Sequence, residues 1–290
     1  MTRQARQTLQ GWAVAGPIIL YFAIFTLIPL GMVFYYCFTD WDGLSSTWNI
    51  VGFGNFKKIF TDMYYLRPLL NTFIISFFII VLSMGFGLLA ALLMTKDIRA
   101  KGFFRTIFYI PVVLSMAVVS QMVNVWISPV DGTLNAIMTA LGLERVSWTQ
   151  STGWMTAVII IICVWKGLGQ TIVLYIAGLQ SIPREIYEAA ELDGASTLQS
   201  FAYITIPMLR NTTTFVLITS IIGAFNMFEP VQLISHGGPD GTTKVILYQI
   251  YDEAFNNFNM GMSNALSVLT LFIIGILSFI NMRREGKQDE

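Results

Sequence analysis

Long runs of apolar residues dominate the chain, and each run is about 20 residues or more, the length that crosses the hydrocarbon core of a bilayer. Six runs reach this length, at about 12–37, 69–94, 104–127, 154–178, 210–231 and 263–282. Because backbone groups in lipid must be hydrogen-bonded internally, each run is expected to be a helix. We therefore predict an all-α polytopic membrane protein with six transmembrane helices, forming a single domain over residues 1–290.

Lysine and arginine are distributed unevenly between the segments that connect these runs. If the N-terminus is placed inside, eleven basic residues lie on the inner side: Arg3, Arg6, Lys96, Arg99, Lys101, Arg105, Arg184, Arg210, Arg283, Arg284 and Lys287. Five lie on the outer side: Lys57, Lys58, Arg67, Arg145 and Lys244. Because cytoplasmic segments of membrane proteins carry the excess of basic residues, both termini are predicted to be cytoplasmic.

Composition agrees with a membrane protein and excludes several other classes. Hydrophobic residues make up 55% of the chain and charged residues 12%, about half the charged share of a soluble domain. The net charge is zero, so no nucleic-acid partner is expected. Cys37, Cys163 and His236 are too few for a disulfide scaffold or a Cys- or His-based metal site. The first apolar run is longer than a signal h-region, so it is expected to be a retained membrane helix.

The inner segment at 181–208 has the pattern of two short helices joined at a glycine. Ser181 is a residue type that caps helix N-termini. Gly194 is a natural stop or bend. A second helix is expected from about Ser196 to Pro207. The segment is therefore predicted to lie across the inner face of the membrane.

The same segment resembles the cytoplasmic signature of permeases in binding-protein-dependent ATP-binding-cassette (ABC) importers. That signature reads Glu-Ala-Ala, three residues, Gly, nine residues, Ile, one residue, Leu-Pro. The matching residues here are Glu188, Ala189, Ala190, Gly194, Ile204, Ile206 and Pro207, with Ile206 in place of Leu. The stretch Asp193-Gly194-Ala195 is similar to the sugar-type branch of the family. Further similar stretches are Val51–Phe56, Asn71-Thr72 and Gly237-Gly238-Pro239.

The resemblance implies a type I ABC importer permease fold and a set of partners in the cytoplasmic membrane of a bacterium or archaeon. A second homologous permease would complete the path, two ATPase subunits would bind below, and an external solute-binding protein would deliver a carbohydrate, expected to be an oligosaccharide. The coupling contacts with the ATPase would come from Glu188, Ala189, Ala190, Asp193 and Gly194.

Nucleotide chemistry is expected to reside in the partners. The sequence contains no Gly-x-x-x-x-Gly-Lys-Ser/Thr loop, so ATP and Mg²⁺ are predicted to bind the partner ATPases, with no cofactor in this chain. The chain is accordingly predicted to be a transport subunit and not an enzyme. The stretch Gly85-Phe86-Gly87 lies within an apolar run, where close helix packing is its expected role.

Polar residues within the spans indicate where a solute would pass. Apart from Arg105 and Arg210 at inner span ends, Lys166 and Glu229 are the only charged residues inside the predicted spans, and intramembrane charges usually face a protein interior or a watery cavity. The resemblance implies solute contacts from the helix before the signature loop and from the helix after it. The candidates are Trp165, Lys166, Gly167, Gln170, Ser220, Gly223, Ala224, Asn226, Met227 and Glu229.

Other readings of the sequence remain open. A secondary transporter driven by an ion gradient would need inward-facing carboxylates or broken helices, and Glu229 alone gives little support for one. A membrane anchor without a path is another class. Lys166 and Glu229 could also pair with each other or serve only packing. Within the importer family, a polyol or a glycerol phosphate is the alternative solute.

Overall fold

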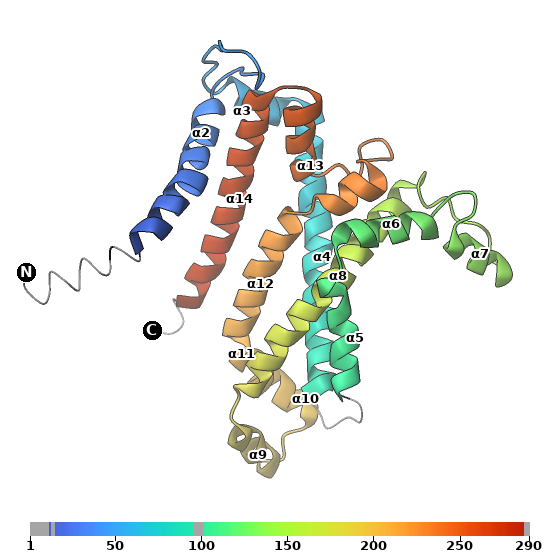
Figure 1. Cartoon of the computed structure of the whole chain (residues 1–290). Coiled ribbons are helices and arrows are strands. Elements are labelled where there is room, and N and C mark those ends of the chain that lie inside the picture. The colour runs from blue at the N-terminus through green and yellow to red at the C-terminus, as the bar shows by residue number, and fades with distance from the viewer. Residues whose placement is uncertain (1–11, 13–14, 96–100, 287–290) are drawn as a thin grey trace, which may run out of the picture. The chain divides into compact units, whose positions relative to one another are not determined.

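The computed structural model describes residues 12, 15–95 and 101–286 (Figure 1). These residues form helices and connecting loops. They divide into two compact units. The first unit comprises the described residues up to Met63 together with Gln249–Leu271, and the second comprises Tyr64–Tyr248 together with the described residues from Phe272.

Several helices have the length and composition of membrane spans. Four of them are straightforward candidates: Ala15–Tyr36, Met63–Thr95, Thr152–Gln180 and Met260–Arg283. Two further pairs qualify only when each bent pair is taken as one span: Gly102–Val113 with Met116–Trp126, bent by 97°, and Thr197–Met208 with Arg210–Phe225, bent by 65°. The described residues therefore contain four to six candidate spans.

The first unit begins with a helix in which a π-helical turn, η1 (Ala23–Leu27), leads into α2 (Ile28–Tyr36). Pro29 explains this local widening, since its ring clashes with the carbonyl four residues back in a regular α-helix. The unit also contains α3 (Gly54–Thr61), η4 (Asp252–Asn256) and most of the first half of α14 (Met260–Gly286).

Two buried polar side chains hold the loops of the first unit. The amide of Asn55 donates to the carbonyls of Cys37 and Thr39 at 3.0 and 2.8 Å. The buried carboxylate of Glu253 accepts hydrogen bonds from three side-chain amides, those of Gln249, Asn257 and Asn259. These bonds replace the contacts with water that the buried groups lose.

The second unit is arranged around one long helix, α8 (Thr152–Gln180), against which α5 and α12 pack. Its other elements are α4 (Met63–Thr95), α5 (Lys101–Val113), α6 (Met116–Trp126), α7 (Thr133–Ala140), α9 (Arg184–Leu192), α10 (Thr197–Ser200), η2 (Phe201–Thr205), α11 (Ile206–Met208), α12 (Arg210–Phe225), η3 (Val231–Ser235) and the start of α13 (Ile246–Tyr251). Within this unit, α9 and α10 lie at one end of α8, and α6 and α7 lie toward the other (Figure 1).

Small residues allow the neighbours of α8 to approach closely. A Cβ atom at Gly87 of α4 would collide with the side chain of Thr171. A Cβ at Gly169 would collide with the carbonyl oxygen of Phe108 in α5, and one at Gly178 would collide with the side chain of Thr212 in α12. The expectation of close helix packing is confirmed at Gly87, whereas Gly85 has open space around it.

At two places a helix ends although the apolar run in the sequence continues. The run at 104–127 breaks at Leu114 and Ser115, and Pro111 lies inside α5, three residues before the break. The run at 210–231 leaves the helix at Asn226, so Glu229 lies beyond α12, at the start of a second helical stretch that leads into η3, and not in one continuous helix as predicted. Apolar side chains continue through both breaks, and hydropathy alone therefore does not show them.

We predict that Gly87→Ala destabilises the chain and Gly85→Ala does not. The added methyl group at 87 overpacks the contact between α4 and α8, at a cost of about 1–3 kcal/mol. The methyl group at 85 meets no neighbour, and alanine favours the helix by up to about 1 kcal/mol. Thermal unfolding of the two variants in the same detergent tests this, and equal melting temperatures would contradict the packing role of Gly87.

Candidate functional site

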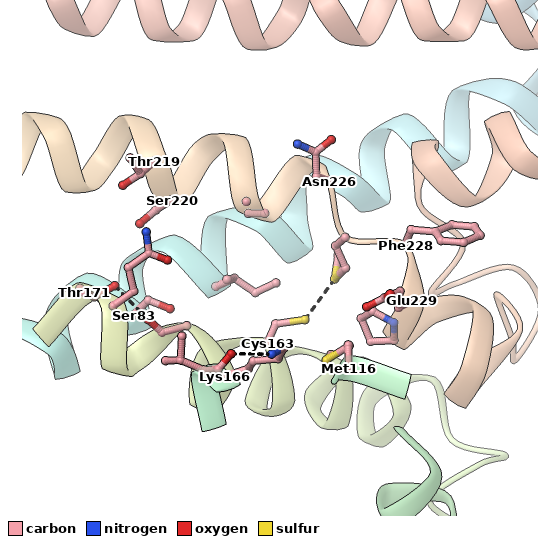
Figure 2. Close-up of a pocket in the computed structure, with 18 of the residues that line it drawn as sticks. Ser83, Met116, Cys163, Lys166, Thr171, Thr219, Ser220, Asn226, Phe228 and Glu229 are labelled. Carbon is pink, nitrogen blue, oxygen red and sulfur yellow. Dashed lines mark hydrogen bonds between the residues drawn. The ribbon is translucent and has the colours of Figure 1, made fainter. Parts of the chain in front are cut away.

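A cavity of about 440 Å³ lies within the second unit, between α4, α5, α6, α8, α12 and the segment that follows α12. Much of its wall is apolar, but polar side chains from several elements reach it (Figure 2). These polar residues are Ser83, Lys166, Gln170, Thr171, Thr219, Ser220, Asn226 and Glu229. Small-molecule sites have this character, a mostly apolar cavity with a few placed polar groups.

Nine of the ten residues predicted to contact the solute line this one cavity: Lys166, Gly167, Gln170, Ser220, Gly223, Ala224, Asn226, Met227 and Glu229. Trp165 is not among the lining residues, and its side chain is 40% exposed. Adjacent residues of a helix point about 100° apart, so Trp165 and Lys166 of α8 present different faces. The solute contacts themselves stay a prediction.

The cavity also includes residues that the sequence reasoning did not select. Cys163 and Thr171 are on the cavity face of α8, one turn before Lys166 and one turn after Gly167. Helical spacing from the selected residues would have found both. Ser83 comes from α4 and Met116 from α6, and nothing in the sequence pattern indicated that these helices reach the cavity.

Lys166 is held by the backbone of the broken helix. Its ammonium group donates to the carbonyl of Leu114 at 2.7 Å and to those of Pro111 and Val112 at 3.3 and 3.4 Å. Within the described residues, no ion pair joins Lys166 to Glu229. Lysine near the C-terminal end of a helix binds its last carbonyls and complements the helix dipole.

The segment after α12 forms another part of the wall. α12 ends at Phe225, and Asn226 leaves the helical conformation. Met227 is buried, with its sulfur atom 3.5 Å from the Cys163 sulfur of α8. The amide of Asn124 in α6 donates to the carbonyl of Leu233 in η3 at 2.7 Å. The irregular backbone at 226–228 therefore has an anchored neighbour on each side.

The loop at 181–208 has the two-helix form predicted from the sequence. α9 ends at Leu192 with Asp193 as its C-cap, and Gly194 follows with a φ of 79°, a left-handed conformation that favours glycine. Ser196 and Gln199 then form a reciprocal capping box at the start of α10. One detail was wrong: Ser181 ends α8 and does not cap α9, whose N-cap position is Pro183.

The loop is braced by a contact within itself but leaves much of its surface open. The Tyr187 hydroxyl of α9 is 2.9 Å from the hydroxyl of Thr205, which is buried. Glu188 forms an ion pair with Arg184 at 3.0 Å, and both side chains are largely exposed. Three large apolar side chains on the loop are also exposed, those of Leu192 (90%), Leu198 (76%) and Tyr203 (80%). Exposed apolar side chains on such a loop are available for contact with a partner.

Comparison with known proteins agrees with this structure. The family model described as "Binding-protein-dependent transport system inner membrane component" matches residues 83–283. The probable ABC transporter permease protein YesP of Bacillus subtilis is 34% identical over 95% of this chain and 90% of its own length. The multiple sugar-binding transport system permease protein MsmF of Streptococcus mutans is 31% identical over 96% of this chain and 95% of its own.

A solved structure shows the same fold. It is the crystal structure of a bacterial alginate ABC transporter in complex with an alginate pentasaccharide-bound periplasmic protein. One of its chains superposes with a TM-score of 0.82 at 24% identity, and the match covers 96% of this chain and 94% of that chain. The family match and the two relatives confirm the resemblance inferred from the loop at 181–208, and an ion-gradient-driven transporter is not favoured.

The matched family segment includes α8, the loop, α12 and most of the cavity wall. Together with the candidate spans, it establishes a multi-pass protein of the cytoplasmic membrane. The chain belongs to the family of inner-membrane components of binding-protein-dependent transport systems, as an ABC transporter permease subunit and not an enzyme.

Proposed function

We propose that this permease forms one half of the path of an ATP-driven importer for a carbohydrate, in particular an oligosaccharide. The observation that carries the proposal is the cavity between α8 and α12, where Gln170, Ser220 and Asn226 present amide and hydroxyl groups. Such groups both donate and accept hydrogen bonds, as sugar hydroxyls require. The relative MsmF is named for the transport of multiple sugars.

The charge of the cavity favours a neutral sugar over a glycerol phosphate. Lys166 is the one basic residue among the described residues that line it, and its ammonium group is engaged by backbone carbonyls. Glu229 adds an acidic group to the same wall. Phosphate recognition normally uses arginine or lysine donors that are free to bind it.

The proposed topology has six spans with both termini in the cytoplasm. The pair Gly102–Val113 with Met116–Trp126 then counts as one span, and the fifth span is the run at 210–231, which begins with Arg210–Phe225 and excludes Thr197–Met208. This orientation follows from the excess of basic residues on the inner side. It places α9 and α10 at the cytoplasmic end of the second unit and α6 and α7 at its outer end (Figure 1). The loop at 181–208 would therefore face the ATPases.

The partners follow from this arrangement. A second homologous permease completes the path, and two ATP-binding-cassette ATPase subunits bind ATP and Mg²⁺. A solute-binding protein docks on the outer face. The coupling contact is assigned to Glu188, Ala189, Ala190, Asp193 and Gly194, of which only Ala190 is partly buried in this chain. Closure of the ATPase dimer would then move the loop and the helices attached to it.

We predict that Gln170→Ala and Glu229→Ala each lower solute uptake while the complex still assembles. Each removes a polar group from the cavity, and one lost hydrogen bond corresponds to a loss of about 3- to 10-fold. Uptake into proteoliposomes with the purified complex and its binding protein is the measurement.

A control for this prediction is Gln180→Ala, which removes the same side chain from α8 outside the cavity. Uptake should remain near the wild-type rate in that variant. Wild-type uptake in both cavity variants would refute the assignment of the solute path.

We predict that Glu188→Ala weakens coupling to the ATPase and that Arg184→Ala does not. Both substitutions remove the ion pair within α9, but only the first removes the proposed contact with the ATPase. Exposed ion pairs contribute about 0–1 kcal/mol, so α9 itself should persist in both variants. Co-purification of the ATPase and hydrolysis stimulated by the loaded binding protein measure the effect. Equal behaviour of the two variants would mean that Glu188 has no coupling role.

A further inference from the structure

The break between α5 and α6 leaves backbone carbonyls without helical partners. The last four carbonyl groups of any helix have no intrahelical donor, and here that end lies opposite Lys166, midway along α8. Inside a membrane such groups must find a partner within the protein. The Lys166 ammonium serves the carbonyls of Pro111, Val112 and Leu114 together.

A second contact brings α5 close enough for this arrangement. Gly169 lies one turn after Lys166 on α8, where a Cβ atom would collide with the backbone of Phe108. The two helix backbones are therefore nearly in contact beside the lysine. The side chain of Lys166 is partly buried, and its donors are directed at the end of α5.

The break shapes the cavity. It turns α6 by 97° from the direction of α5. As a result Val112 of α5 and Met116 of α6 stand on either side of the break, and both line the cavity next to Lys166. Figure 2 shows Met116 and Lys166 on the wall that faces Ser220 and Asn226 of the α12 side.

We propose that Lys166 is a positioning residue, whose charge holds the α5–α6 break and thereby the wall of the cavity, and is not presented to the solute. This role of Lys166 rests on the proposed solute path only where solute uptake is measured. The ammonium charge complements the partial negative charge at the C-terminal end of α5. Its three donors satisfy carbonyls that would otherwise be unpaired beside a cavity.

The test compares Lys166→Met with Lys166→Arg in the full complex in lipid nanodiscs. Methionine keeps an unbranched apolar stem but no donor, whereas the guanidinium group of arginine can donate to several carbonyls. Hydrogen–deuterium exchange over residues 110–120 reports the break directly. We expect exchange there to rise about tenfold in Lys166→Met, because the local opening becomes easier, and to stay near the wild-type rate in Lys166→Arg.

Transport supplies the second readout. A positioning role predicts a lower maximal uptake rate in Lys166→Met, an unchanged solute concentration for half-maximal uptake, and rescue by Lys166→Arg. Lys58→Met, which removes an exposed lysine of α3, controls for loss of positive charge and should leave both readouts unchanged. If Lys166→Met does not assemble, Lys166→Gln provides the same comparison with a weaker donor.

The outcomes separate this inference from the proposed solute path. Raised exchange with normal uptake would support positioning and remove the cavity from the path. Wild-type exchange in Lys166→Met, or in Lys166→Gln where that variant is used, would overturn the positioning role even if uptake fell. Exchange in Lys166→Arg as high as in Lys166→Met would also overturn it, since a cation with several donors would then have failed to replace the ammonium.

Discussion

The structure depends on one constraint, which is that backbone polar groups inside a membrane must be hydrogen-bonded by the protein itself. Continuous helices meet it without help. The second unit departs from continuous helix at two places beside the cavity, after Val113 and after Phe225. Each departure is supported from a neighbouring element, by Lys166 of α8 at the first and by Asn124 of α6 just beyond the second. Irregular backbone is found where it lines a cavity, as expected for transport proteins.

α8 connects the cavity to the loop at 181–208. α8 combines a cavity face carrying Lys166 and Gln170 with a lower end that continues into the loop at 181–208. The loop is joined to the buried core near Tyr175 and Leu209 through Ile182 and Tyr187. A force applied at α9 is therefore passed to the helices that line the cavity through packed side chains and not through a flexible linker.

Much of this could be predicted from the sequence, and the misses have physical causes. Apolar runs indicate spans because side-chain hydrophobicity determines which segments lie in lipid. Gly194 was identified because few residues other than glycine adopt its backbone conformation. The partners of Lys166 were not predictable, since they are main-chain carbonyls that every residue carries. Trp165 was selected with its neighbours because adjacency in sequence does not show which face of α8 a side chain occupies.

The glycine contacts along α8 limit how the second unit can deform. Gly87 receives Thr171, Gly169 receives the backbone of Phe108, and Gly178 receives Thr212, so that α4, α5 and α12 are each fixed to α8 at a set height. Sliding any of them by one turn, about 5.4 Å along the axis, would bring a larger side chain to a contact that glycine now makes. These contacts therefore oppose slippage of the four helices past one another, and we expect α4, α5, α8 and α12 to move together as one body.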